Sequence, residues 1–288
     1  MPREEEIGKA YKNYYTHQNN IAKKNRPFRQ AYDYIKKGYL SWRFGYSTAQ
    51  STCQKLLGTL LFMHPYRRTT IDREMMFLKY RPGGVLLDVG CGSGEKMALF
   101  QSLGWQTAGI DLDELAIMQA RKKGLEVRSG SLQEQHYPDA YFDAIIMDNV
   151  IEHVFDPVGI LQECHRILKP QGILVAVTPN VESLGHRVFG ASWRGLEPPR
   201  HLYLFTGAAV KRVMKNGRFQ KCSVSTSAAG AAFIYSMSRD CINAGDHGPK
   251  LGRIILERCG AKIAFGVEWG LLKLRSYLGE ELIIIAQK

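Results

Sequence analysis

The sequence lacks the features that mark exported, membrane-spanning and zinc-finger proteins. No two of its six cysteines are closer than 18 residues, which excludes a CxxC zinc site and a compact disulfide framework. The longest apolar runs, such as 56–63 and 282–286, fall far short of the roughly 20 residues that a membrane span needs. The first residues are polar and charged, unlike a secretory leader. We therefore expect reduced cysteines and a cytoplasmic protein.

Acidic residues are scarce in the first part of the chain. Residues 1–82 carry 16 Lys and Arg against 6 Asp and Glu, so they hold a net +10 of the chain's +12. The same segment contains 14 of the 30 aromatic residues. Composition changes near Pro82, and no internal repeat is present. This change predicts a basic, aromatic-rich helical cap over 1–82 and a separate body over 83–288.

From residue 83 onward, short apolar runs alternate with helical patterns, which is typical of a parallel sheet built from βαβ units. The predicted fold is α/β: a Rossmann-like, doubly wound, mostly parallel seven-stranded sheet with an N-terminal helical extension. A helical insertion over 229–275 is expected before the last strand. The expected strands are Val85–Val89, Thr107–Ile110, Leu125–Arg128, Phe142–Met147, Ile173–Thr178, Phe219–Ser225 and Glu281–Ala286. The expected helices of the first part are Pro27–Phe44, Ser47–Met63 and Thr70–Tyr80.

The first predicted strand runs into a glycine-rich loop, DVGCGSG, over 88–94. In a doubly wound sheet, ligands bind at the carboxyl ends of the strands, and glycines let the backbone approach them closely. A nicotinamide-binding loop typically reads GxGxxG and faces a pyrophosphate. Here the spacing is GxGxG, and Asp88 would repel a pyrophosphate. The acid suits a ligand with an amino group, such as the methionine part of S-adenosylmethionine (SAM). A purely structural role for Asp88, bonding the loop, is the alternative.

The next three strands also end in polar residues. Asp111 ends the second strand and is suited to accept hydrogen bonds from ribose hydroxyls, although it could also cap the helix that starts at Glu114. Segment 130–132 is placed to read an adenine edge, and segment 148–149 to face the methionine tail. The predicted cofactor-binding residues are Asp88, Gly90, Cys91, Gly92, Gly94, Asp111, Leu112, Ser131, Leu132, Asp148 and Asn149.

From Leu86 to about Thr226, the sequence resembles the class I SAM-dependent methyltransferases, in particular the broad methyltransferase type 23 group. The resemblance lies in the segments LLDVGCGSG, GWQTAGIDLD, FDAIIMDNVIEHVFDP, LKPQGILVAVTPN and PPRHLYLFT. It implies SAM as cofactor, with S-adenosylhomocysteine as product. It also implies a small-molecule methyl acceptor, such as a quinone or lipid precursor or a sugar intermediate, and oxygen is the preferred acceptor atom.

Two histidines are candidates for the chemistry. Transfer to an oxygen requires that the acceptor lose a proton, which calls for a general base. His153 follows the fourth strand and His201 lies in the PPRHLYLFT segment, so both are predicted as catalytic residues. Each could instead be a structural histidine that packs a helix start or fixes a loop.

The Glu152–His153 pair also resembles the quinone-precursor O-methyltransferases, in which a carboxylate three residues earlier helps to bind a divalent metal. Asn149 stands at that position here, so we expect no functional metal.

Several functions remain open for the basic first part. It could close over the acceptor, with Tyr14, Tyr15 and Tyr32 lining an apolar pocket. It could be a peripheral surface for membranes or phosphate-bearing substrates, or a solvated surface with no partner. It could also bind RNA, which would make the protein an RNA methyltransferase. Because the N/D-P-P-Y motif of nucleic-acid amino-methyltransferases is absent, we do not expect a nucleic-acid partner. A non-catalytic SAM-binding module is the remaining alternative.

Overall fold

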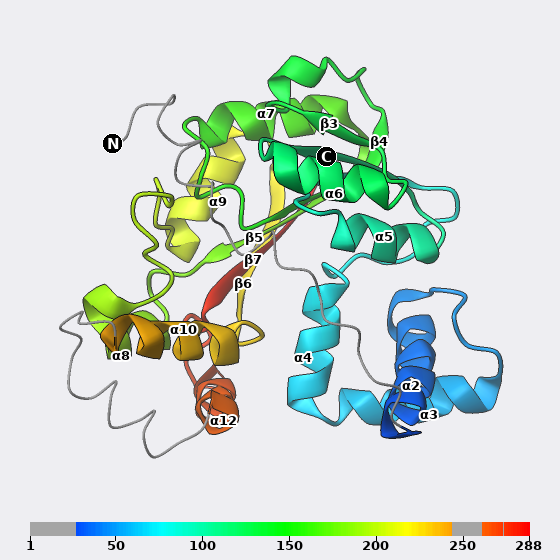
Figure 1. The fold of residues 1–288 in the computed structure, drawn as a ribbon, viewed down its shortest axis with the longest axis vertical. Helices are drawn as coiled ribbons and strands as arrows, with labels where there is room; N and C mark the ends of the chain where they lie inside the picture. The colour runs from blue at the N-terminus through cyan, green and yellow to red at the C-terminus, as the bar shows by residue number, and fades with distance from the viewer. Residues whose placement is uncertain (1–26, 244–260, 273) are drawn as a thin grey trace.

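The computed structural model describes residues 27–243, 261–272 and 274–288, and its centre is one seven-stranded sheet (Figure 1). The strands are β1 (Val85–Val89), β2 (Gln106–Asp111), β3 (Val127–Ser129), β4 (Phe142–Asp148), β5 (Leu168–Pro179), β6 (Lys221–Ser227) and β7 (Glu281–Gln287). Their order is β3-β2-β1-β4-β5-β7-β6, and only β7 runs antiparallel to its neighbours. The predicted α/β fold is confirmed, and the strand order reverses between β1 and β4.

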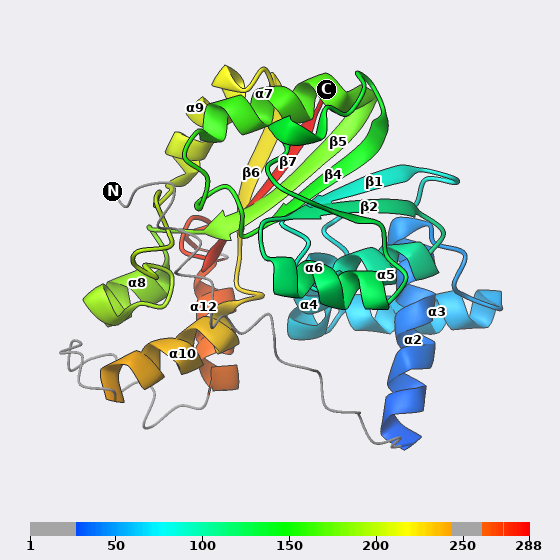
Figure 2. The same cartoon turned by 45° about the horizontal axis from the view of Figure 1, so that its top comes forward.

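The two faces of the sheet are buried under separate layers of helices (Figure 2). Leu87 points to one face, which α7 (Pro157–Ile167) and α9 (Gly207–Asn216) cover. Leu86, its neighbour in the strand, points to the other face, because side chains alternate along β1. The helices α5 (Glu95–Ser102) and α6 (Glu114–Lys122) lie on the side of Leu86. Burial on both faces explains the nearly continuous apolar runs of the central strands.

Three N-terminal helices extend the layer on the α5 side: α2 (Pro27–Phe44), α3 (Thr52–Phe62) and α4 (Pro65–Glu74). The predicted extension is confirmed, but α4 does not occupy the expected range 70–80. Pro65, two residues beyond the expected helix Ser47–Met63, opens α4, since the first turn of a helix needs no N–H from its first residue. His64 caps this helix by accepting from the Arg67 N–H.

The contact between α2 and α3 depends on two glycines. A Cβ on Gly38 would lie 1.9 Å from the Gln54 carbonyl oxygen, and a Cβ on Gly58 would lie 2.2 Å from the Gly38 carbonyl carbon. The helices therefore cross with their backbones in contact. Tyr39 then ties α2 to α4, because its hydroxyl donates to Asp72 Oδ1 at 2.6 Å.

The chain after β5 forms the remaining helices: α8 (Leu184–Phe189), α10 (Ala231–Asn243) and α12 (Ala261–Leu272), with short 3-10 turns at 133–135 and 190–192. The expected helical insertion over 229–275 corresponds to α10 and α12, which pack against each other. Its middle part, 244–260, lies outside the described residues, as do Tyr14 and Tyr15.

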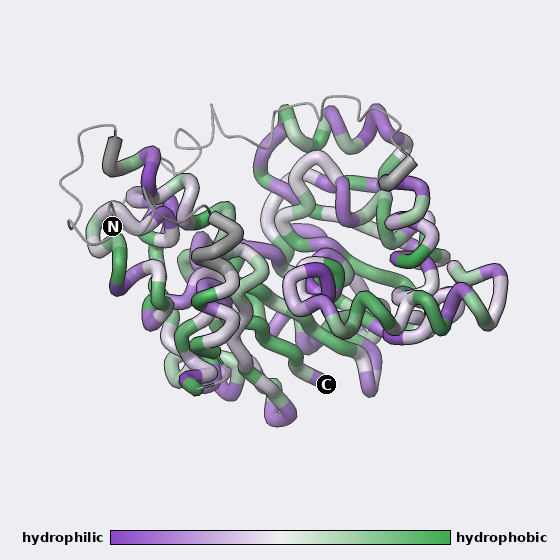
Figure 3. The backbone as a smooth tube through the Cα atoms, turned by 90° about the horizontal axis from the view of Figure 1, so that it is seen from below, coloured by the Kyte–Doolittle hydropathy of each residue, from purple (hydrophilic) through white to green (hydrophobic). Residues whose placement is uncertain are grey.

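Hydrophobic residues run through the centre of the molecule, where the strands lie, and recur on the outer helices (Figure 3). Among the described residues, no helix has the length and apolar character needed to cross a membrane.

Candidate active site

The loop after β1 takes a conformation that its glycines alone permit. Gly90, Gly92 and Gly94 have φ angles of 71°, 53° and 75°. A Cβ on Gly90 would lie 2.5 Å from Val150 Cγ2, and one on Gly94 would lie 2.3 Å from Leu125 Cδ1. Any side chain at these positions would displace the loop from the carboxyl ends of the strands.

Asp111, at the end of β2, holds this loop in place. Its Oδ2 accepts from the Gly92 N–H at 2.6 Å and its Oδ1 from the Asp113 N–H at 2.8 Å. Asp113 is the residue that caps α6, because it accepts from the Leu115 N–H at 2.9 Å. The cap alternative for Asp111 is therefore wrong. Burial raises the pKa of Asp111. The hydrogen bonds from the Asp113 and Gly92 N–H groups oppose this shift and favour the ionised carboxylate.

Asp88 lies in β1, one residue before the strand ends, and its carboxyl is buried. Burial raises its pKa to about 8; Lys96 opposes the shift, whereas the negative charges of Asp148 and Asp111 add to it. A cationic ligand group beside Asp88 would favour the ionised form. This environment would suit a positively charged ligand; the role of Asp88 in binding the cofactor stays a prediction.

Asp148, at the end of β4, lies among cations that the sequence did not single out. Arg73, from α4, forms an ion pair with Asp148, and its Nε lies 3.2 Å from Glu281 Oε1. Lys96 Nζ lies 2.8 Å from Asp148 Oδ2. Although burial opposes ionisation, Arg73 and Lys96 together hold the pKa of Asp148 well below its usual range. The helical extension thus supplies a charged side chain to the carboxyl edge of the sheet.

The other predicted cofactor residues occupy varied positions. The Cys91 side chain is buried in the core behind the loop, and its N–H donates to the Ile110 carbonyl oxygen at 3.0 Å. Leu112 is exposed just after β2, whereas Leu132 is part of the core. The Ser131 N–H, expected near the adenine, donates to Glu134 Oε2 at 2.6 Å.

These residues fit SAM. The glycines leave a backbone cradle that a Cβ would fill, and Asp88 offers a buried carboxyl to a cationic group. Asp111 presents an acceptor beside the loop, and Lys96 and Arg73 bring the positive charge that a carboxylate ligand needs.

A pocket lies beyond the ends of β4 and β5, next to α10. It is lined by Asn149, His153, Pro179, Arg194, Gly195, Glu197, His201, Gly230, Phe233, Ile234, Glu280 and Glu281. Asn149 follows Asp148 in a left-handed conformation (φ 54°) and is exposed at the pocket. The pocket therefore adjoins the charged group around Asp148 and includes both predicted catalytic histidines.

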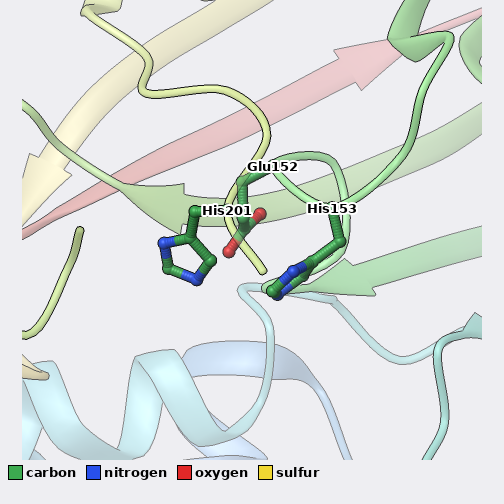
Figure 4. A group of neighbouring side chains, drawn as sticks. All are labelled: Glu152, His153 and His201. Atoms are coloured by element: carbon green, nitrogen blue, oxygen red, sulfur yellow. The ribbon is translucent and has the colours of Figure 1, made fainter. Parts of the chain in front are cut away.

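His153 and His201 meet at this pocket, with ring centroids 4.7 Å apart (Figure 4). His153 Nδ1 lies 3.0 Å from the Arg200 carbonyl oxygen, and His201 Nδ1 lies 2.7 Å from that of Gly195. Since a carbonyl oxygen only accepts, both Nδ1 atoms carry a proton, and Nε2 is the basic nitrogen of each neutral ring. Burial and the nearby His201 lower the pKa of His153 to about 4, and burial also lowers that of His201.

Glu152 lies between the two histidines and the end of β5 (Figure 4). Its Oε2 accepts from the Thr178 hydroxyl at 3.0 Å, while its buried Oε1 has no hydrogen-bond partner among the described residues. Burial raises its pKa to about 8. One ligand atom each from Glu152, His153 and His201 lie within 4.8 Å of one another, so the group also has donors that a metal ion could use. Sequence adjacency revealed the first two; only the fold brings His201 to them.

The PPRHLYLFT segment is attached to the β4 loop by its backbone. The Glu152 carbonyl oxygen accepts from the Leu202 N–H at 2.8 Å and from the Tyr203 N–H at 3.1 Å. These bonds explain why two separate motifs of the sequence form one site.

Known proteins share both the sequence motifs and the fold. A family model described as a methyltransferase domain matches residues 63–222. A probable SAM-dependent methyltransferase of Mycolicibacterium smegmatis is 35% identical over 100 residues, covering 34% of this chain and 39% of the relative. A ubiquinone biosynthesis O-methyltransferase of Cereibacter sphaeroides is 32% identical over 130 residues, covering 42% of this chain and 53% of the relative. The chain thus spans only about a third to a half of the length of such relatives.

Solved structures confirm the architecture. A SAM-dependent methyltransferase from Archaeoglobus fulgidus aligns over 80% of this chain and 99% of its own, with a TM-score of 0.52 at 18% identity. A phosphoethanolamine N-methyltransferase of Haemonchus contortus, crystallised with SAM, aligns over 93% of this chain and 61% of its own, with a TM-score of 0.53 at 17% identity. The family match covers more than half of the chain and includes the glycine loop, Asp111 and both histidines. The chain therefore belongs to the methyltransferase-domain family and has the class I fold of its members.

Proposed function

We propose that the protein transfers the methyl group of SAM to an oxygen atom of a small molecule held in the pocket beside α10. The observation that carries this proposal is the meeting of His153 and His201 at that pocket, next to Asp148 and Asn149. When bound, SAM supplies a methyl carbon made electrophilic by its sulfonium. The residues of the protein must orient the acceptor and remove its proton.

The cofactor is assigned to the loop over 88–94 and the strand ends around it. Asp88 would hold the amino group of the methionine part, and Asp111 would accept from the ribose hydroxyls. Lys96 and Arg73 would supply the positive charge for the methionine carboxylate. This set explains why cations and carboxylates alternate along the carboxyl edge of the sheet.

Proton removal is assigned to Nε2 of His153 or His201. Their lowered pKa values keep both rings neutral near pH 7, so the base is present in its active form. The backbone carbonyls of Arg200 and Gly195 hold the ring orientation. Glu152, with a pKa of about 8, keeps its proton at neutral pH, so we assign it a positioning role and assign no metal to the group.

We assign the acceptor to one chemical class: hydroxylated molecules that also have an apolar part. Phe233 and Ile234 give the pocket an apolar wall, and Arg194, paired with Glu197 at 2.8 Å, gives it a polar one. The similarity to a ubiquinone biosynthesis O-methyltransferase supports a quinone-precursor type of acceptor.

We also propose that residues 1–82 form a helical cap on a methyltransferase domain of residues 83–288. Within the described part, the contribution of this cap to the site is Arg73. Tyr32, expected at an apolar pocket, lies instead beneath the Arg67 guanidinium, at 4.7 Å.

The test is single-turnover methyl transfer from labelled SAM to a panel of catechols, phenols and sugars, combined with calorimetry of SAM binding. His153→Ala and His201→Ala should each bind SAM normally. The variant that lacks the histidine acting as the base should transfer the methyl group roughly 100-fold more slowly. His165→Gln, which lies on α7 against Phe219, is the matched control and should turn over like the wild type.

Three outcomes would contradict the proposal. Wild-type rates in both histidine variants would remove the proposed base. SAM binding without transfer to any acceptor of the panel would favour a non-catalytic SAM-binding module. Loss of turnover in EDTA, restored by Zn²⁺ or Mn²⁺, would reassign Glu152, His153 and His201 as metal ligands.

A further inference from the structure

Helix α3 presents an apolar face that no described residue covers. Leu56, Leu60 and Met63 follow one another at helical spacing, and 65%, 55% and 79% of their respective surfaces are exposed. They lie opposite Gln54 and Gly58, which contact α2 on the buried side of the helix. An amphipathic helix normally turns such a stripe toward a core, so its exposure needs an explanation.

Two exposed aromatic side chains flank this stripe, on the side of α3 next to α2. Trp42 of α2 and Phe62 of α3 contact each other with ring centroids 5.5 Å apart, and they are 46% and 41% exposed. Arg68 lies over the Phe62 ring, at 4.6 Å from its centroid. We call Trp42, Leu56, Leu60, Phe62 and Met63 the α3 face. The face thus combines long aliphatic side chains with an indole, the side chain that favours a lipid–water boundary.

Basic side chains outnumber acidic ones around the α3 face. Between Asp33 and Asp72 the sequence contains no acidic residue but six basic ones. Among the described residues, Lys37, Lys55 and Arg67 form no ion pair and are exposed. The apolar face therefore has a positive border.

The α3 face is linked to the site through α4. In Figure 1, α4 lies between α12 and the helices α2 and α3, which project to the side away from α10. Helix α4 joins this face directly to Arg73 at the carboxyl edge of the sheet.

We propose that the α3 face docks on an anionic lipid bilayer, with its apolar side chains in the headgroup–acyl boundary and its lysines and arginines against lipid phosphates. The apolar side chains would be buried in the headgroup–acyl boundary, which is favourable. The basic side chains around them would be attracted to the anionic lipid headgroups. A second copy of the chain fits less well, because two such faces would bring their positive borders together. This proposal does not depend on which acceptor is methylated.

The test is flotation of the full-length protein with vesicles of phosphatidylcholine alone or with 30 mol% phosphatidylglycerol. We expect the wild type to float with anionic vesicles only, and to be released by about 0.5 M NaCl. Leu56→Ser/Leu60→Ser/Met63→Ser should weaken binding at least about tenfold. Lys37→Gln/Lys55→Gln should remove the preference for anionic lipid. These side chains are exposed, so SAM affinity and the circular dichroism spectrum should not change.

The matched control changes exposed apolar residues elsewhere. Met118 on α6 and Leu274 near the start of β7 are 50% and 83% exposed, so Met118→Ser/Leu274→Ser should bind vesicles like the wild type. Wild-type protein that binds neither vesicle would overturn the proposal. So would a triple variant that binds as well as the control. A dimer in analytical ultracentrifugation that the triple variant dissociates, without vesicle binding, would assign the face to self-association. Salt-sensitive binding of RNA in place of vesicles would also overturn it.

Discussion

The two ends of the site, the cofactor loop and the acceptor pocket, are built in different ways. The loop over 88–94 and Asp111 lie within one short stretch of sequence, and the Gly92 N–H donates directly to the Asp111 carboxylate. The pocket gathers residues from the β4 loop, the PPRHLYLFT segment, α10 and the start of β7. Local sequence therefore specifies the cofactor end, whereas tertiary structure specifies the acceptor end. Four experiments test this difference, from the largest expected effect to the smallest.

Arg73 connects the two ends, and its removal should have the largest effect. Arg73→Met leaves the largely buried Glu281 without its cation and leaves Asp148 with Lys96 alone. We expect a loss of about 3 kcal/mol in the free energy of unfolding, measured by urea denaturation. The double variant Arg73→Met/Glu281→Gln should recover part of this loss, because the carboxylate that lost its cation is then neutral. Equal stabilities of the single and double variants would contradict the ion-pair assignment.

Raised carboxyl pKa values at the acceptor end should make stability fall with pH. Glu152 binds its proton more tightly in the folded chain, with a pKa of about 8, than at its ordinary value of 4.5. Its contribution is fully present below pH 4.5 and is lost as the pH rises through about 8. Between pH 5 and 8.5 the wild type should lose about 3 kcal/mol more than Glu152→Gln. Parallel unfolding curves for the two proteins would show that Glu152 titrates normally.

The glycine positions of the loop should not tolerate a side chain. Gly90→Ala puts a Cβ against Val150 at a left-handed position, and we expect roughly 100-fold weaker SAM binding by calorimetry. Gly124→Ala is the matched control: its φ is also positive, at 78°, but nothing lies within 4 Å of the new Cβ. It should cost stability and leave SAM affinity unchanged. If both variants lose the same affinity, backbone strain and not loop packing is the cause.

Two acids at the end of β2 should differ in their effects on the cofactor. Asp111→Asn loses a charged acceptor of the Gly92 N–H, and we expect about tenfold weaker SAM binding. Asp113→Asn keeps a good helix cap and should bind SAM like the wild type. Equal losses of SAM affinity in these variants would mean that the loop does not depend on Asp111.

The sequence predicted the elements whose information is local. Strands β1 and β4 have the continuous apolar pattern of buried strands, and the glycine loop needs only neighbouring residues for its geometry. The range of α4 was wrong because a proline both ends and begins helices, and the sequence does not show which. The approach of His201 to His153, and of Arg73 to Asp148, follows from packing between distant segments, for which no spacing rule exists.

The pair of Arg73 and Glu281 has a consequence for synthesis of the chain. The two residues are separated by 208 positions, and β7 lies between β5 and β6 in the sheet. On the ribosome, β1 to β5 emerge first, and β6 must wait for the last strand before it can join them. Arg73 remains without its second carboxylate until β7 has emerged. Folding of this molecule is therefore expected to finish at the point where cofactor and acceptor meet, since contacts that close long loops form late.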